Sequence, residues 1–237
     1  MRILLVSDLH YSLRQYDWIA STASGFDAVA IAGDHLDVVS PVSVDAQIAA
    51  VRASLADIAG RTRLLACSGN HDLNARNDAG EKAADWLDAL RGAGAVVDGD
   101  RVEIGDTTFS VLGWWDGPAA RSRIESALAS QPRGRRWVWV YHSPPHGPLA
   151  WTGSKHFGDP VLAEWIERWR PDAVLTGHIH QAPFTTDGLW VERRGDTWVF
   201  NAGRQIGDVP ARIEIDLDGA GARWVSLAGI DERALTP

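Results

Sequence analysis

The chain has 237 residues, a formal net charge of −8 at neutral pH and a hydrophobic fraction of 45%. This length is normal for one α/β domain with a sizeable core, and the acidity argues against a general nucleic-acid binder, which needs a basic surface. The single cysteine, Cys67, excludes an internal disulfide and is expected to be a buried small hydrophobe. The amino-terminal apolar run is far too short for a signal peptide, and no stretch reaches the roughly 18 apolar residues of a membrane span. We therefore expect a soluble cytoplasmic protein.

The first part of the chain alternates short apolar runs with segments of helical spacing. The apolar runs are predicted as buried strands, and the third helical segment is closed by Gly92. Such alternation favours a mainly parallel sheet with helices packed on it. In chain order, we predict a strand at 2–6, a helix at 16–23, a strand at 27–32, a helix at 44–59, a strand at 64–67 and a helix at 81–91.

The pattern changes after residue 94, where turn signals join shorter strands. Two hairpins are predicted near the end of the chain, and neither an internal repeat nor a linker separates the two parts. We therefore predict an α/β fold with a single domain over 1–237, built as a two-sheet β-sandwich flanked by helices. The predicted elements are short strands over 95–112, a helix at 119–130, a strand at 137–141, a helix at 161–169, a strand at 173–176 and hairpins at 190–201 and 212–227.

Five of the eight histidines fall in short clusters of metal-ligand residue types. Nearly all the clusters follow a predicted strand, which places them at one edge of a sheet. The clusters are Asp8-Leu9-His10, Gly33-Asp34, Gly69-Asn70-His71-Asp72, Tyr141-His142 and Gly177-His178-Ile179-His180.

The spacing and chemistry of these clusters suit a pair of metal ions. Side chains two residues apart at a strand end, such as those of Asp8 and His10, point to the same face and can reach one ion. The carboxylate of Asp34 can bridge two cations. Mixed nitrogen and oxygen ligands suit Mn²⁺, Fe, Zn²⁺, Co²⁺ or Ni²⁺, whereas the lack of thiolates argues against a structural zinc cage. Each cluster alone is weak evidence for a metal site, but the five clusters together predict a two-metal hydrolytic site.

In order and spacing, the five blocks resemble the calcineurin-like metallophosphoesterase superfamily. The resemblance spans residues 8 to 180 and implies a β-sandwich flanked by helices with a dinuclear site. It implies that His71 is not a ligand but faces the scissile phosphate and protonates the leaving oxygen. Its adjacency suggests that Asp72 orients His71. The implied ligands are Asp8, His10, Asp34 and His180 for one ion, and Asp34, Asn70, His142 and His178 for the other.

The chemistry of such a site is consistent with this division of roles. Two ions roughly 3.5–4 Å apart can clamp a phosphate and lower the pKa of a bridging water, and the resulting hydroxide attacks phosphorus in line. An imidazole that titrates near neutral pH can protonate the alkoxide that leaves. No protein nucleophile is required.

Two features narrow the resemblance to particular branches of the superfamily. The residues after Asp34 lack the Asp-Arg-Gly run of the phosphoprotein phosphatase branch, which argues against a Ser/Thr protein phosphatase or a dinucleoside tetraphosphatase. The run from His142 to His146 looks similar to the His-x-Pro-Pro stretch of the cyclic-nucleotide phosphodiesterase-like branch. The candidate substrate-binding residues are Asn70, His35 and His146, with the two histidines also weighed as ordinary loop residues. Weaker pocket candidates are Trp114, Trp115, Lys155, His156 and Arg204.

The leading hypothesis is an enzyme that hydrolyses a small phosphodiester, with a cyclic nucleotide as one candidate. A phosphomonoesterase is the alternative, and a nuclease or a non-catalytic interaction scaffold is less favoured. The acidity and the lack of a basic run argue against a nuclease. A scaffold is disfavoured because such family members lose ligands or the catalytic histidine. The expected partner is a small phosphoester substrate. Binding to a membrane is not expected, and binding to nucleic acid is disfavoured. The sequence leaves open the metal and the choice between diester and monoester.

Overall fold

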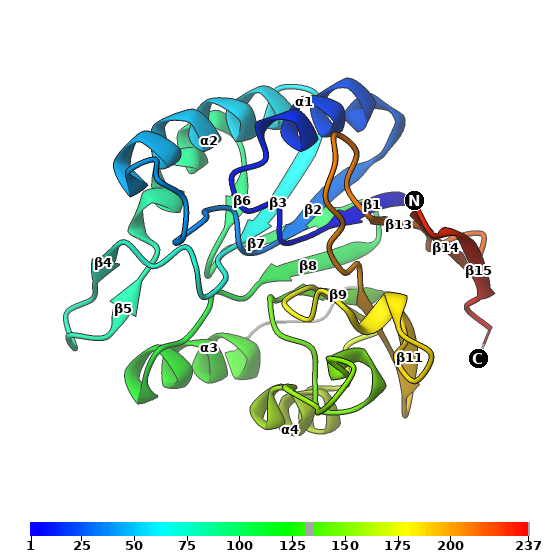
Figure 1. Ribbon diagram of the computed structural model, residues 1–237. Helices are drawn as coiled ribbons and strands as arrows, with labels where there is room; N and C mark the ends of the chain where they lie inside the picture. The colour runs from blue at the N-terminus through cyan, green and yellow to red at the C-terminus, as the bar shows by residue number, and fades with distance from the viewer. Residues whose placement is uncertain (131–134, 237) are drawn as a thin grey trace.

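The computed structural model describes residues 1–130 and 135–236. Two large β-sheets pack face to face, and helices cover the outer face of each (Figure 1). The predicted two-sheet β-sandwich with flanking helices is therefore confirmed. Among the described residues, no helix combines the length and the apolar character needed to cross a membrane.

The first sheet has seven strands in the order β15-β14-β13-β1-β2-β3-β6. Strands β1, β2, β3 and β6 run parallel. Strand β13 pairs antiparallel with β1, β14 antiparallel with β13, and β15 antiparallel with β14. Its strands are β1 (Arg2–Val6), β2 (Ala28–Ala32), β3 (Arg63–Cys67), β6 (Val96–Val97), β13 (Arg212–Asp216), β14 (Gly221–Ser226) and β15 (Gly229–Ala234).

The second sheet has six strands in the order β11-β12-β10-β9-β8-β7. Its four central strands are parallel, and the two edge strands are antiparallel to their neighbours. Its strands are β7 (Arg101–Ile104), β8 (Thr107–Val111), β9 (Arg136–Val140), β10 (Ala173–Thr176), β11 (Val191–Arg194) and β12 (Thr197–Asn201). A separate small hairpin consists of β4 (Ala75–Arg76) and β5 (Lys82–Ala83).

Two helical layers enclose the sandwich (Figure 1). Asp159 caps α4 by accepting hydrogen bonds from the amides of Val161 and Leu162, and Ser43 caps α2 in the same way. The layer on the first sheet contains α1 (Leu13–Thr22), α2 (Val44–Ala59) and the 3₁₀-helix η2 (Asp85–Ala93). The layer on the second sheet contains α3 (Pro118–Ser130) and α4 (Pro160–Trp169). Short 3₁₀ turns are η1 (Ala23–Gly25), η3 (Pro148–Ala150) and η4 (Ala182–Phe184).

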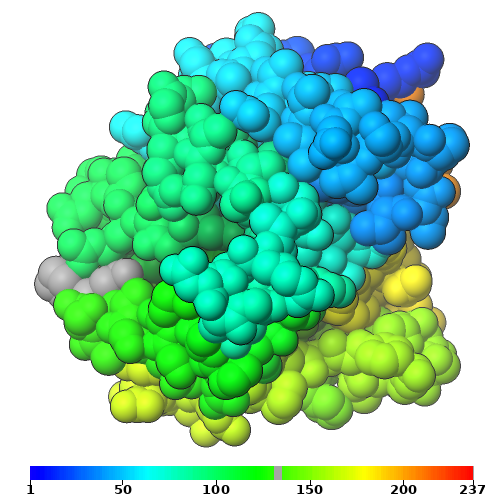
Figure 2. Space-filling view, turned by 90° about the vertical axis from the view of Figure 1, so that its left-hand side faces the viewer, coloured from blue at the N-terminus to red at the C-terminus, as the bar shows by residue number. Residues whose placement is uncertain are grey.

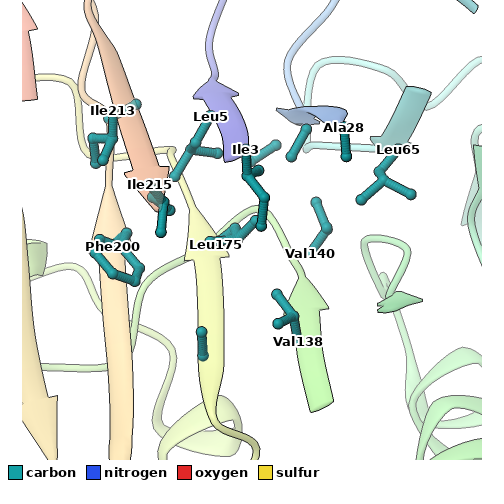
Figure 3. Packing of buried hydrophobic residues seen from close by; sticks show 14 of the residues in the cluster. Ile3, Leu5, Ala28, Leu65, Val138, Val140, Leu175, Phe200, Ile213 and Ile215 are labelled. Carbon is teal, nitrogen blue, oxygen red and sulfur yellow. The ribbon is translucent and has the colours of Figure 1, made fainter. Parts of the chain in front are cut away.

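The core is layered by the alternation of side chains along each strand. On β1, Ile3 and Leu5 point between the two sheets, whereas Leu4 and Val6 pack under the helices. Figure 3 shows Ile3 and Leu5 above Leu175 and Val140 of the facing sheet. Strands that are buried on both faces read as continuous apolar runs, which is why the sequence pattern located them.

Two local predictions differ from the structure. The helix predicted at 81–91 is instead strand β5 followed by η2, and Gly94 rather than Gly92 ends it, with φ +84°. The Glu81 carboxylate accepts hydrogen bonds from two amides at the start of α3, and the Lys82 amide donates to Asp116, so tertiary contacts hold this stretch extended. Strand β15 was not predicted, because it is mostly exposed and has no apolar alternation.

Candidate metal centre

The predicted ligands follow the carboxyl ends of parallel strands in both sheets. Such ends meet at one edge of an α/β structure, which brings loops far apart in sequence together. Asp8 and His10 follow β1, Asp34 follows β2, Asn70 and His71 follow β3, His142 follows β9, and His178 and His180 follow β10.

The first ligand cluster contains Asp8, His10, Asp34 and His180, whose donor atoms lie within 4.8 Å of one another. The Nε2 atoms of His10 and His180 are 3.2 Å apart, and His180 Nε2 is 3.1 Å from Asp8 Oδ1. His10 Nε2 lies 3.8 Å from Asp34 Oδ2. This is the group that the sequence assigned to one ion.

The second cluster contains Asp34, His142 and His178. His142 Nε2 is 3.3 Å from Asp34 Oδ2 and 3.1 Å from His178 Nδ1. Among the described residues, the buried Oδ1 of Asn70 has no hydrogen-bond partner, as expected for an oxygen that serves a cation. Asp34 thus belongs to both clusters, which is the position required of a bridging carboxylate.

The donor set fits two divalent transition-metal cations. Imidazole nitrogens face one another at hydrogen-bonding distance, and a buried carboxylate lies between them, an arrangement that a cation pair satisfies better than protons alone. His142 Nδ1 donates to the carbonyl oxygen of Ala32 at 2.7 Å, and His10 Nδ1 lies 3.3 Å from that of Leu36. These bonds turn the Nε2 atoms of both rings toward the cluster, as outer hydrogen bonds of metal ligands do.

The electrostatics of the cluster are dominated by burial and by Asp34. Burial opposes ionisation of Asp34, but His142 outweighs it and holds the pKa of this carboxyl well below its usual range. Burial likewise opposes the charged form of His142, yet Asp34 and Asp8 raise the pKa of His142 to about 9. Burial lowers the pKa of His10 and of His178 to about 4. Both of those rings are therefore neutral at pH 7, which is the form that binds metal.

The backbone of the ligand loops is held in an uncommon conformation. Asp8, His10, Asp34 and His178 all have positive φ, from 42° to 65°. Non-glycine residues adopt this region at a cost of about 1–3 kcal/mol each, and such residues concentrate at functional sites. A Cβ on Gly69 would lie 2.3 Å from Asp34 Oδ1, so this glycine allows the β3 loop to approach the bridging carboxylate.

The His71 ring lies beside the clusters. His71 Nε2 is 4.0 Å from Asp34 Oδ2, and the His71 amide donates to Asp34 Oδ1 at 2.9 Å. Its buried Nδ1 has no hydrogen-bond partner. About a quarter of the His71 side chain is exposed, so the ring is accessible to a substrate.

Asp72 does not orient His71, contrary to the sequence-based suggestion. Its carboxylate is buried and accepts hydrogen bonds from the amides of Leu36 and Gly69, so it holds two loops together. The carboxylate near His71 is Asp37, which forms a third group of candidate ligand atoms with His10 and His71. Sequence reasoning missed Asp37, although its position three residues after the bridging Asp34 was a usable signal.

The match of a family model to this sequence shows the protein family to which the chain belongs. The model described as calcineurin-like phosphoesterase matches residues 1–182, well over half of the chain. The chain belongs to the calcineurin-like phosphoesterase family. This membership supports a metal-dependent phosphoester hydrolase, and the family typically binds two divalent metal ions.

Solved structures share the fold of this phosphoesterase at low sequence identity. TT1561 of Thermus thermophilus superposes with a TM-score of 0.61 at 15% identity, over 99% of both chains. Purple acid phosphatase PPD1 from yellow lupin (Lupinus luteus) seeds gives a TM-score of 0.57 at 13% identity, over 99% of this chain and 51% of the lupin chain. The phosphoesterase thus spans about half the length of the lupin enzyme, and these likenesses show the fold alone. No curated protein matches its sequence.

The two histidines predicted to bind substrate lie in different surroundings. His35 of the phosphoesterase is fully buried, with Nδ1 accepting from the Tyr16 hydroxyl at 3.1 Å and Nε2 donating to the Cys67 carbonyl at 3.0 Å. Both ring nitrogens are thus used internally, which contradicts substrate contact by His35. His146 is exposed, with its ring 5.0 Å from that of His156, and its contact with substrate stays a prediction.

Two weaker candidates lie next to the ligands. The Trp114 ring is 5.7 Å from the ring of His142 and 5.6 Å from that of His178. The Arg204 amide donates to the carbonyl oxygen of His180 at 3.2 Å. After burial, which is the main cause, the charge of Arg204 also lowers the pKa of His10, so a cation stands beside the phosphoesterase's metal centre.

Proposed function

We propose that this chain hydrolyses a small phosphodiester with two divalent transition-metal ions bound by its clustered histidines and carboxylates. The observation that carries the proposal is that Asp34 belongs to both ligand clusters, with His71 beside it. When bound, the two ions would polarise the phosphate oxygens and lower the pKa of a water molecule to supply the nucleophile. The proposed ligands are Asp8, His10, Asp34, Asn70, His142, His178 and His180.

The protein's own residues have separate tasks in this proposal. The hydrogen bonds from His10 and His142 to backbone carbonyls fix their metal-facing nitrogens. His71 donates a proton to the leaving oxygen. Arg204 contributes positive charge beside the first cluster, which favours binding of the phosphate anion.

A diester is favoured over a monoester by the loop that presents His142. This loop carries the run His142-Ser143-Pro144-Pro145, whose four residues are buried and which resembles the stretch found in the cyclic-nucleotide phosphodiesterase-like branch. The prolines fix the backbone of the loop. A cyclic nucleotide is therefore one candidate substrate, and the general class is a small phosphodiester.

The proposal is tested by hydrolysis of bis-p-nitrophenyl phosphate and p-nitrophenyl phosphate in the presence of Mn²⁺. We expect turnover that disappears on chelation and returns on metal addition, with the diester preferred. His71→Ala should retain its metal, measured by elemental analysis, and lose activity by about 10²-fold or more. If neither ester is turned over in a metal-dependent way, the proposal that this chain is a phosphoester hydrolase is refuted. Full activity of the His71→Ala variant would refute the role of His71 as the acid.

A further inference from the structure

A cleft of about 550 Å³ lies between the β4–β5 hairpin, η2 and α3. Figure 2 shows the face of the molecule on which these segments meet. This volume is within the range of sites that hold small organic ligands. Its apolar lining residues are Ala84, Val111, Leu112, Trp114, Ile124 and Ala127.

Trp114 is shared between the cleft and the metal centre. It lines the cleft, and its ring also contacts the imidazoles of His142 and His178. The Trp114 amide donates to Ser68 Oγ at 2.9 Å, and the Ser68 amide donates to Asp98 Oδ1 at 2.8 Å. The inner wall of the cleft is therefore joined to the loop that carries the candidate ligand Asn70. Trp114 is thus the residue at which the cleft adjoins the candidate metal centre.

The rim of the cleft carries positive charge that the protein leaves without carboxylate partners. In the described part of the chain, no ion pair involves Arg76, Lys82 or Arg123, and the Arg76 guanidinium donates to a neutral carbonyl oxygen. Arg123 lies near the Glu81 carboxylate and interacts with its charge, although the two form no ion pair in the described part of the chain. These three cations lie around one cleft, although the chain as a whole has a net charge of −8.

The other charged groups that line the cleft are Arg91 and the carboxylates of Asp85, Asp88 and Asp98. Arg91 is paired with Asp88 and Asp100. The Asp85 carboxylate accepts a hydrogen bond from Asn74 at 2.7 Å. The Asp98 carboxyl is buried against Ser68. The lining of the cleft thus combines apolar residues with four cations against three carboxylates.

We propose that this cleft binds the organic group that is esterified to the scissile phosphate, and that this group is aromatic or aliphatic and carries its own carboxylate or phosphate. The body of the group packs against Trp114 and Ile124, and its anionic end meets Arg76, Lys82 and Arg123. The proposal rests on the proposed function, because it takes the metal centre as the phosphate site. It favours diesters with a second anionic substituent over a cyclic nucleotide, which has none.

The test compares the binding of benzylphosphonate and 4-carboxybenzylphosphonate by isothermal titration calorimetry of the metal-loaded protein. Neither probe has an ester bond to hydrolyse, and they differ only in the carboxylate. We expect the carboxylated probe to bind about fivefold more tightly, which is the size of one or two solvated ion contacts. Lys82→Gln combined with Arg123→Gln should abolish this difference and leave benzylphosphonate binding unchanged.

The matched control combines Arg61→Gln with Arg135→Gln, which removes two exposed cations that pair with Asp57 and Asp106 outside the cleft. This control should keep the fivefold difference. Equal affinity of wild type for both probes, or no binding of the carboxylated probe, would overturn the inference. If the difference is present but no phosphoester is turned over, the cleft binds the anionic group of a ligand, whereas the proposed hydrolysis and the assignment of that group to a scissile ester both fail.

Discussion

At the scale of single residues, the surroundings of His71 determine how this histidine can act. Its ring lies beside the bridging Asp34, and its Nδ1 is left without a partner. Besides Asp34, the carboxylate of Asp37 lies near the ring, in one group of candidate ligand atoms with His10 and His71, and we expect it to orient His71.

Replacing Asp37 with Asn should therefore lower kcat by about tenfold, which is typical when an orienting partner of a site residue is lost. KM and metal content should change little, because Asp37 lies outside the two ligand clusters that share Asp34. Asp72→Asn is the comparison, and it should mainly reduce stability, since one of two backbone amides loses its acceptor at about 1–3 kcal/mol. Steady-state kinetics with elemental analysis distinguish the two variants, and an unchanged kcat for Asp37→Asn would contradict the assigned role.

Asp98 is a second residue whose surroundings have a measurable consequence. Burial raises the pKa of Asp98 to about 6, although the hydrogen bonds from Ser68 oppose this shift. Because the pKa in the folded state exceeds the unfolded value of 3.8, the folded protein binds the extra proton. The resulting stabilisation is present below about pH 4 and is lost as the pH rises through about 6.

Asp98→Asn should remove this pH dependence, because the amide stays neutral and its oxygen can still accept from Ser68. At pH 7 the variant should exceed the wild type in free energy of unfolding by up to about 3 kcal/mol, since one pKa unit corresponds to about 1.36 kcal/mol. The difference should shrink toward zero at pH 4. Urea unfolding of both proteins at pH 4, 5, 6 and 7 measures it, and a difference that does not vary with pH would count against this explanation.

Sequence reasoning identified the candidate ligand set but misassigned two neighbouring residues. Ligand types recur at strand ends, where the direction of side chains follows from the strand. His35 and Asp72 were instead assigned by their adjacency in sequence to Asp34 and His71, and adjacency gives no guide to the direction of a side chain in a loop. His35 points into the core toward Tyr16, and Asp72 points toward the amides of the neighbouring loops.

At the scale of elements, the β3 loop reaches the bridging carboxylate because Gly69 has no side chain. Gly69→Ala would place a methyl group 2.3 Å from Asp34 Oδ1 and 2.6 Å from the Asp34 backbone nitrogen, so the backbone itself would have to shift. We expect metal content and activity to fall together, by about tenfold or more, in a protein that stays folded. Elemental analysis and circular dichroism measure this. Gly92→Ala is the matched control, since a Cβ there meets nothing within 4 Å, and equal losses in both variants would exclude the steric explanation.

The elements that could be predicted are those whose pattern is local. Strands buried on both faces, such as β1 and β2, are continuous apolar runs, and their ends were located to within a residue. The segment from Glu81 has helical spacing, yet contacts with α3 and with Asp116 hold its start extended. Such long-range contacts are absent from any window of the sequence. Strand β15 forms by pairing with β14, and its polar residues gave no signal.

At the scale of the whole molecule, the candidate metal centre brings together residues of both sheets. Asp8, Asp34 and Asn70 come from loops of the first sheet, whereas His142 and His178 come from loops of the second. Direct hydrogen bonds also cross between the sheets, from the His178 amide to Asp8 Oδ2 at 3.0 Å and from His142 Nδ1 to the Ala32 carbonyl. Bound ions would add to these contacts and stabilise the association of the sheets.

Removal of metal should therefore lower the melting temperature. A ligand at 100 times its Kd stabilises the folded state by about 2.7 kcal/mol, which corresponds to about 5–10 °C for a chain of this size. Calorimetry before and after chelation, and again after addition of Mn²⁺, measures the shift and its reversal. A variant that lacks ligands on both sheets, Asp34→Ala with His178→Ala, should melt at the same temperature with and without Mn²⁺. A metal-independent melting temperature of the wild type would argue that ions do not join the sheets.

The pairing of β1 with β13 has a consequence for synthesis on the ribosome. β1 emerges first, but the strand that covers its outer edge begins at Arg212, and the last candidate ligand is His180. At about 5–20 residues per second, roughly ten seconds or more separate these events. A nascent chain therefore presents Asp8, His10 and Asp34 long before His142, His178 and His180 exist, so the full set of candidate ligands is assembled late in biogenesis.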